Sequence, residues 1–217
     1  MGQGALSTDT LGSKSTALGY AALTTQNFTT ATDTYNTAVG YAAGNAVTTG
    51  ISNVLVGGLA GDALTDADQN VAVGTSALGA DTLGSSSVAI GNNALTAQNF
   101  TTATTTYNTA VGFNAGVAVT TGTLNTLIGG IAGDSLTTGT RNVAVGVSAL
   151  QNDQTGSKSV AIGTRALTTQ RPATATDMYN VAVGEDAGLE ITTGTSNTLI
   201  GGLAGDAITT GASNVAV

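Results

Sequence analysis

The chain has 217 residues, of which 8% are charged, and its formal net charge is −8 at pH 7. This acidic, cation-poor composition argues against binding to nucleic acid or to an anionic membrane face, because a row of phosphates needs clustered lysines and arginines. The chain has no cysteine and no histidine, so nucleophilic triads and the usual transition-metal sites are nearly excluded. We therefore predict that the protein is not an enzyme and needs no cofactor.

The distribution of apolar residues narrows the class of protein further. No run of about 18 apolar residues occurs, so no transmembrane helix is predicted. The opening MGQGALSTDT lacks the basic end and the apolar stretch of a signal peptide. Weak charge combined with many Val and Ile residues argues against disorder. Because large side chains are few, we expect a thin core of Ala, Val, Ile and Leu.

One five-residue pattern recurs along the chain: Asn or Ser, Val or Thr, Ala or Leu, Val or Ile, then Gly. It reads NTAVG at 36–40, NVLVG at 53–57, NVAVG at 70–74, SVAIG at 87–91, NTAVG at 108–112, NTLIG at 125–129, NVAVG at 142–146, SVAIG at 159–163, NVAVG at 180–184 and NTLIG at 197–201. The closing glycines follow one another at a spacing of seventeen, and every fourth spacing is lengthened to twenty-one. One long and three short units make a super-repeat, of which the chain holds three copies.

A 17-residue unit is too short for a helical hairpin repeat, which needs more than about thirty residues. It suits one rung of a β-solenoid, with two short strands and two turns. In NVAVG the two valines point to one side of the strand, and Asn, Ala and Gly point to the other. We predict an all-β fold, a parallel β-solenoid or β-roll of about twelve rungs. It forms a single repeat domain over 1–217.

Two positions of the repeat predict how the rungs stack. Three residues after the closing glycine an Ala recurs, without exception from Ala43 to Ala204, which indicates a place where rungs or chains approach closely. The Asn or Ser that heads each motif predicts a ladder of side chains that hydrogen-bond to backbone groups of the turns.

The longer units contain the insertions QNFTTATDTYN (26–36), QNFTTATTTYN (98–108) and QRPATATDMYN (170–180). They hold five of the eight aromatic residues: Phe28, Tyr35, Phe100, Tyr107 and Tyr179. A long aromatic turn is a candidate for receptor contact. The favoured alternative is that these rings cover the gap opened by the inserted residues.

Acidic residues give two further candidate sites. Asp62, Asp134 and Asp206 lie in GGLAGDAL-like segments that resemble a calcium-binding nonapeptide, but the spacing is off and no adjacent rung repeats the Asp. They are weak calcium candidates, and a turn-stabilising role is favoured. Glu185, Asp186 and Glu190 form one acidic cluster, for which a solvated face is favoured over acid–base chemistry.

The copies SSVAIG (86–91) and KSVAIG (158–163) resemble the head repeats of trimeric autotransporter adhesins, the YadA-like family, whose repeats centre on an Asn-Ser-Val-Ala-Ile-Gly core. Through the recurring motif the resemblance covers essentially the whole chain. It implies a left-handed parallel β-roll in which three chains wrap side by side into an obligate trimer. It also implies attachment to host surfaces or matrix. Similar repeats occur in tail fibres of bacterial viruses.

We therefore expect a structural and adhesive segment of an extracellular, cell-surface or virion fibre, which acts as a homotrimer and binds a host protein or glycan receptor. Met1 and Val217 hold the same place in the super-repeat, in mid-strand. This favours a segment of a longer array over subunits that stack end to end into a mechanical filament. Ice binding is the least favoured alternative, because the Thr-Thr pairs lie mostly in turns beside Gly.

Overall fold

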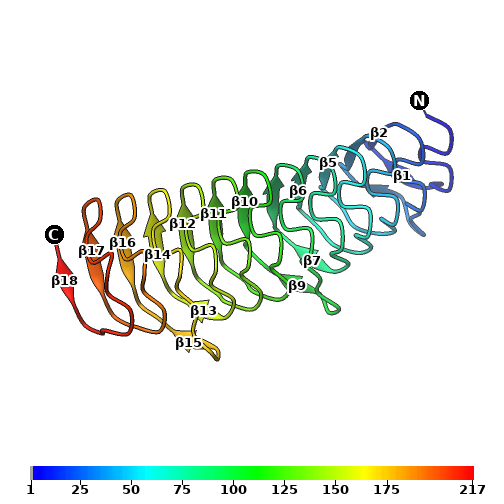
Figure 1. The fold of residues 1–217 in the computed structure, drawn as a ribbon. Helices are drawn as coiled ribbons and strands as arrows, with labels where there is room; N and C mark the ends of the chain where they lie inside the picture. Colours follow the sequence, from blue (N-terminus) through cyan, green and yellow to red (C-terminus); the bar gives the residue numbers. More distant parts are fainter. Residues whose placement is uncertain (1) are drawn as a thin grey trace. The chain divides into compact units, whose positions relative to one another are not determined.

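The computed structural model describes residues 2–217, which form short strands and turns and contain no helix. The predicted parallel β-solenoid is confirmed, with about twelve turns along the chain. The chain divides into two compact units, 1–107 and 108–217. In each unit the strands follow one another rung by rung (Figure 1). Within residues 2–217, no helix exists that could cross a membrane.

Unit 1 holds a parallel ladder of three-residue strands and two short pairs. The strands are β1 (Gly12–Ser13), β2 (Thr16–Leu18), β3 (Thr32–Asp33), β4 (Thr37–Val39), β5 (Val54–Val56), β6 (Val71–Val73), β7 (Gly84–Ser85), β8 (Val88–Ile90) and β9 (Thr104–Thr105). Strands β2, β4, β5, β6 and β8 pair in that order, so that identical motif positions lie side by side. The short strands pair β1 with β3 and β7 with β9.

Unit 2 repeats this arrangement. Its strands are β10 (Thr109–Val111), β11 (Thr126–Ile128), β12 (Val143–Val145), β13 (Gly156–Ser157), β14 (Val160–Ile162), β15 (Thr176–Asp177), β16 (Val181–Val183), β17 (Thr198–Ile200) and β18 (Val215–Ala216). Strands β10, β11, β12, β14, β16, β17 and β18 form the ladder in chain order, and β13 pairs with β15. Each short pair joins the rung before an insertion to the insertion itself.

Of the predicted core residues, Ala and Leu dominate the interior, and Val47, Val119 and Ile191 are also fully buried. The alternation in the motif is as predicted, but the side that faces inward carries Asn and the central Ala or Leu, as in Asn53 and Leu55 of unit 1. The recurring alanine after the glycine, such as Ala60, is also fully buried. The flanking strand valines and isoleucines are half-buried or exposed on the outer face. In these strands the β-branched residues therefore lie on the outer face, and the inward positions carry Ala or Leu.

The closing glycines stack directly on one another. Gly57 has a φ of +141°, and a Cβ atom placed on it would lie 2.5 Å from the carbonyl oxygen of Gly74 in the next rung. Gly129 in unit 2 has a φ of +134° and the same relationship to Gly146. Both the left-handed backbone and the close approach require glycine, which explains why the residue ends nearly every motif.

The predicted ladder of motif-head side chains is present and buried. The backbone N–H of Asn53 donates to Oδ1 of Asn36 at 2.9 Å, and its Nδ2 donates to the carbonyl oxygen of Ala67 at 2.8 Å. In unit 2, Asn125 repeats both bonds, to Oδ1 of Asn108 and to the carbonyl oxygen of Gly139. Among residues 2–217, no buried side-chain nitrogen or oxygen lacks a hydrogen-bond partner. The polar interior is therefore satisfied, which it must be because water cannot reach it.

Candidate functional site

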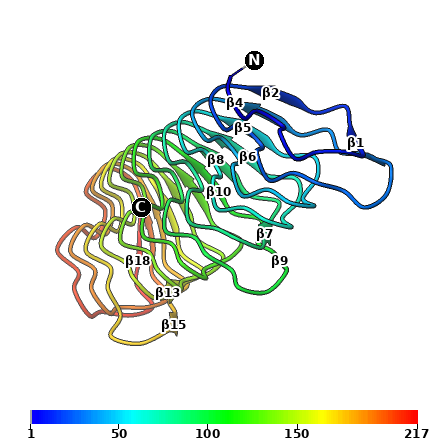
Figure 2. The same cartoon turned by 90° about the vertical axis from the view of Figure 1, so that its right-hand side faces the viewer.

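The inserted turns interrupt the regular succession of 17-residue rungs. Figure 2 shows the chain bulging outward beside β9 in unit 1 and beside β15 in unit 2. The predicted contact residues separate into two groups there. Tyr35, Tyr107 and Tyr179 are exposed by 53%, 61% and 53%, whereas Phe28 and Phe100 are buried. The phenylalanines fill the space under the longer turn, and only the tyrosines are available to a partner.

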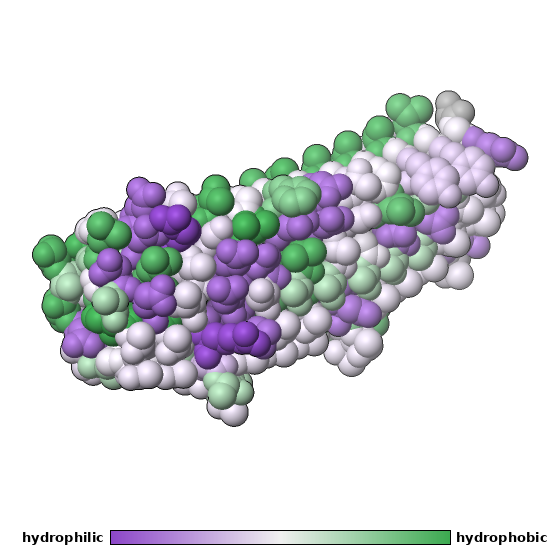
Figure 3. All heavy atoms as spheres, in the orientation of Figure 1, coloured by the Kyte–Doolittle hydropathy of each residue, from purple (hydrophilic) through white to green (hydrophobic). Residues whose placement is uncertain are grey.

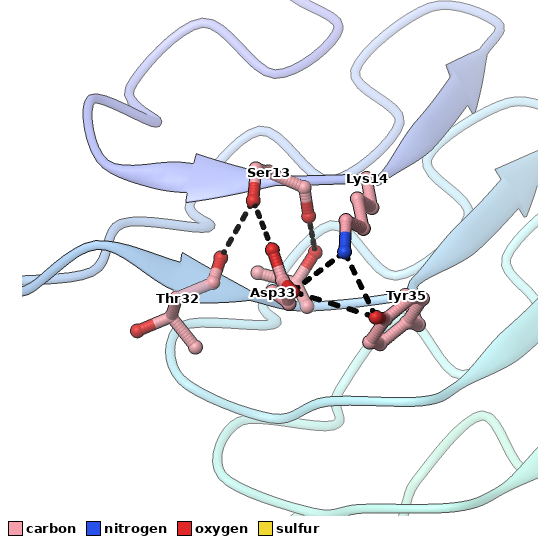
Figure 4. A network of polar contacts seen from close by, with 6 residues as sticks. Ser13, Lys14, Thr32, Asp33 and Tyr35 are labelled. Atoms are coloured by element: carbon pink, nitrogen blue, oxygen red, sulfur yellow. Dashed lines mark hydrogen bonds and ion pairs between the residues drawn. The ribbon is translucent and has the colours of Figure 1, made fainter.

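Tyr35 is held at the surface by a lysine of the preceding rung (Figure 4). Nζ of Lys14 donates hydrogen bonds to Oδ2 of Asp33 at 2.6 Å and to Oη of Tyr35 at 3.0 Å, and lies 5.1 Å from the ring centroid. Ser13 Oγ donates to Oδ1 of Asp33 at 2.8 Å. The hydrogen bond from Lys14 lowers the pKa of Asp33, and the same contact raises the pKa of Lys14.

The third insertion repeats this contact and the second does not. In unit 2, Nζ of Lys158 donates to Oδ2 of Asp177 at 2.6 Å and to Oη of Tyr179 at 2.9 Å. In the second insertion the corresponding residues are Ser86, Thr105 and Tyr107. Since both ion pairs lie at the surface, with Asp33 and Asp177 about half exposed, they add little to stability. Their effect is to fix the orientation of two tyrosine rings.

Beneath the second insertion lies a buried polar network that the sequence analysis did not identify. Gln98 Nε2 donates to Oδ2 of Asp81 at 2.6 Å and to Oγ of Ser87 at 2.9 Å. Oδ1 of Asp81 accepts the backbone N–H groups of Gly84 at 3.1 Å and of Phe100 at 3.0 Å. All three polar side chains are fully buried. The network ties the inserted turn to the rung that precedes it.

The network also supplies the side-chain amide that the asparagine ladder lacks at one rung of each super-repeat. In each super-repeat the motif before the insertion begins with Ser, which has no amide. In the third super-repeat Gln170 supplies this amide: its Oε1 accepts from Nδ2 of Asn180 at 2.8 Å, and its Nε2 donates to Asp153. Burial raises the pKa of Asp153, partly offset by the hydrogen bond from Gln170.

The sequence does carry a signal for this network. Asp-x-x-Gly recurs at 9–12, 81–84 and 153–156, and each copy is followed one rung later by a glutamine, Gln26, Gln98 or Gln170. Glycine is required because the carboxylate occupies the space of its side chain. A Cβ atom on Gly84 would lie 2.1 Å from Oδ2 of Asp81. The spacing therefore identifies a turn-closing aspartate that faces inward and not a surface ligand.

The weak calcium candidates lie in separate turns. Within residues 2–217, no group of three or more acidic side chains could hold a metal ion. Oδ1 of Asp134 accepts from Oγ of Ser135 at 3.2 Å, and its Oδ2 accepts from Nε2 of Gln151 at 3.4 Å. Partial burial raises the pKa of Asp62. The hydrogen bonds of Asp134 agree with a turn-stabilising role, which stays a prediction for Asp62 and Asp206.

The acidic cluster of unit 2 is tied to a cation. Arg165 Nε donates to Oδ1 of Asp186 at 2.6 Å, and its second nitrogen, Nη2, pairs with Oδ2. This contact lowers the pKa of Asp186. Because one carboxylate of the cluster is already paired in two-point contact, it is not a free acid or base for chemistry.

The outer face of the strand ladder carries apolar side chains. Leu18, Val54 and Ile90 of unit 1 are exposed by 53%, 37% and 38%, and Ile128, Ile162 and Ile200 of unit 2 by 38%, 38% and 43%. Figure 3 shows hydrophobic atoms following one another along the upper edge of unit 1, next to a surface that is largely of intermediate hydropathy. In each unit we call these three residues, with their neighbours at the same strand positions, the outer apolar face of that unit.

A stacked pair of tyrosines was also not predicted from the sequence. Tyr20 and Tyr41, each directly after a closing glycine, lie on successive rungs, with ring centroids 5.6 Å apart and planes inclined by 9°. Both are exposed by half or more. Reading the residue after each glycine in register would have found them.

Comparison with protein families, curated proteins and solved structures gives no match to this chain.

Proposed function

We propose that the chain is a structural and adhesive segment of an extracellular, cell-surface or virion fibre. It assembles as a homotrimer and attaches to a host protein or glycan receptor. Its ladders supply a stiff scaffold, since within each unit the rungs are bonded through strands, stacked glycines and asparagine side chains. The inserted turns project from this scaffold. The resemblance to the head repeats of trimeric autotransporter adhesins and to phage tail fibres favours the same role.

The observation that carries the trimer is the outer apolar face. Val, Ile and Leu side chains recur along it, and isoleucines such as Ile128 and Ile162 remain more than a third exposed. A repeated apolar surface of this kind usually marks a protein–protein interface. Because a second and a third copy present the same face at the same spacing, association by this face buries matching side chains rung against rung.

Sedimentation equilibrium of the full chain tests this assembly. The wild type is expected to sediment as a trimer, and Ile128→Asp as a smaller species, because a charge would be buried in the interface. Thr121→Asp adds the same charge at an exposed turn position and should leave the trimer intact. Far-UV circular dichroism checks that both variants fold.

A wild-type chain that remains monomeric at all concentrations would remove the trimer from the proposal. Trimers that persist in Ile128→Asp would place the interface elsewhere. The adhesive role is measured separately, as binding of the labelled chain to host cells or to immobilised matrix, and the absence of any binding would contradict it.

A further inference from the structure

The residue after each closing glycine forms a column along the ladder, and in two places an aromatic residue in this column is followed by a glycine. In unit 1 the column reads Tyr20, Tyr41, Gly58, Thr75 and Asn92. The rungs are in register, because the N–H of Leu59 donates to the carbonyl oxygen of Tyr41 and the N–H of Ser76 to that of Gly58. Tyr41, Gly58 and Thr75 thus occupy successive rungs.

Gly58 leaves an open place in this column. A Cβ atom built on Gly58 would meet no heavy atom within 4 Å outside its own chain neighbours. Its backbone is not in the left-handed region, so neither strain nor close packing calls for glycine there. The contrast with Gly57, which contacts the next rung, shows that the two adjacent glycines have different roles.

The open place lies against the face of an aromatic ring. The rings of Tyr20 and Tyr41 are stacked on successive rungs, and the rung of Gly58 lies on the side of Tyr41 away from Tyr20. The far side of the open place is formed by Thr75, two rungs from Tyr41. At about 4.8 Å per rung, the separation is about 9.6 Å. We use the word slot for this interruption in the column of exposed side chains, which is a surface feature; no enclosed pocket is present in residues 2–217.

Unit 2 contains the same arrangement. Phe113, exposed by 58%, is followed at the next rung by Gly130 and then by Val147. A Cβ atom on Gly130 would also meet nothing within 4 Å. In the third super-repeat the rung before Gly202 carries Glu185 at this position, so no aromatic ring lies beside that glycine.

We propose that the slot between Tyr41 and Thr75 binds a neutral pyranose ring, stacked on the face of Tyr41. The π face of an aromatic ring is electron-rich and attracts the partly positive C–H groups on the face of a sugar. The hydroxyl groups of Tyr41 and Thr75 make no hydrogen bond within residues 2–217 and flank the slot, where they can bond to the sugar's hydroxyls. The net charge of −8 disfavours acidic sugars.

A pyranose suits this slot better than an aromatic side chain does. The slot is open to water, so the rim of its ligand stays solvated, and the hydroxyls of a sugar are satisfied there. The Phe113 slot has no flanking hydroxyl and is expected to bind the same sugars more weakly. This inference deepens the proposed attachment function and rests on it: the slot is the glycan-contacting element of the fibre.

The test is an NMR titration of the full chain, labelled with ¹³C in its tyrosine rings, with methyl β-D-galactopyranoside up to about 50 mM, since a single stacked ring on an open surface binds in the millimolar range. The Tyr41 ring signals, assigned with Tyr41→Phe, should shift and saturate. Gly58→Val fills the slot without removing the ring, and should weaken binding at least tenfold. Tyr107→Ala, far along the sequence, should not change it.

Three results would overturn the inference: no saturable shift of Tyr41, an undiminished shift in Gly58→Val, or a shift with p-cresol and none with the pyranoside. The Gly58→Val variant is expected to fold, because a side chain at position 58 meets open space. Failure here is distinguishable from failure of the fibre proposal. A trimer that ignores pyranosides rejects the slot alone, and a pyranoside-binding monomer rejects the trimer alone.

Discussion

Gln98 donates a hydrogen bond from its Nε2 to Oδ2 of Asp81, on the preceding rung, at 2.6 Å in the interior of unit 1. The same amide donates to Ser87 at 2.9 Å. Neither oxygen can reach water, because both side chains are fully buried. This one side chain therefore satisfies a buried carboxyl group and a buried hydroxyl together.

Replacing this glutamine should be costly. Gln98→Leu leaves the carboxyl group of Asp81 without its side-chain donor, so we expect the free energy of unfolding to fall by about 2–3 kcal/mol. Gln69→Leu, at an exposed position of the same unit, is the matched control and should change it by less than about 0.5 kcal/mol. Urea unfolding followed by circular dichroism measures both. Equal midpoints for the two variants would show that the network adds nothing.

Two adjacent glycines should respond differently to alanine. In Gly57→Ala the new Cβ atom would lie 2.5 Å from the carbonyl oxygen of Gly74, at a φ of +141°, so we expect a loss of about 3 kcal/mol or failure to fold. Gly58→Ala should be tolerated because its Cβ points into open space. Thermal unfolding compares the two variants. If Gly57→Ala is as stable as Gly58→Ala, the rungs do not approach as closely as described.

The pKa values of two aspartates of unit 2 are shifted in opposite directions. Burial raises the pKa of Asp153, so its charged form costs stability above that pKa, and the cost disappears as the pH falls through it. The hydrogen bond from Lys158 lowers the pKa of Asp177, so its stabilisation is present above the unfolded-state pKa and is lost as the pH falls through the lowered value. Carboxyl ¹³C NMR should show Asp153 protonating first on acidification. In Lys158→Met the pKa of Asp177 should rise while that of Asp153 stays unchanged, and the reverse order of protonation would contradict the assignment.

A strained backbone position offers a stabilising substitution. Leu124, which precedes Asn125, has a φ of +61° and a side chain that is 43% exposed. Asn tolerates this left-handed conformation better than Leu does, so Leu124→Asn should raise the free energy of unfolding by about 0.5–1 kcal/mol. Urea denaturation gives the value. A loss of stability would mean that the exposed leucine makes an apolar contact that outweighs the strain.

The fold was predictable from the repeat because periodicity alone requires equivalent rungs. The regular spacing of the closing glycines led to the parallel ladder, and the asparagine at the head of each motif led to the side-chain ladder that Asn36 and Asn53 form. Alternation alone could not say which side of a strand faces inward, since both sides of NVAVG contain apolar residues. That choice depends on how much volume the interior holds, a property of the whole rung.

The candidate contact residues were only partly predictable. Aromatic content identified the inserted turns, but it could not distinguish Phe28, which is buried, from Tyr35, which is exposed. That distinction depends on the three-dimensional path of the insertion. The open place at Gly58 could not be predicted from the sequence. Gly57 and Gly58 are adjacent glycines, and only the structure shows that Gly57 packs against the next rung while Gly58 does not.

A ladder of near-identical layers can slip by one layer and lose little, because each strand finds the same partners again. The aspartate–glutamine network prevents such an offset. A one-layer displacement would separate Asp81 from Gln98 and from the N–H group of Phe100, and would leave Oδ2 of the buried carboxyl group without its donor. The aspartate–glutamine pair recurs once in each super-repeat. It therefore fixes which rung stacks on which, in a chain whose other rungs are nearly identical.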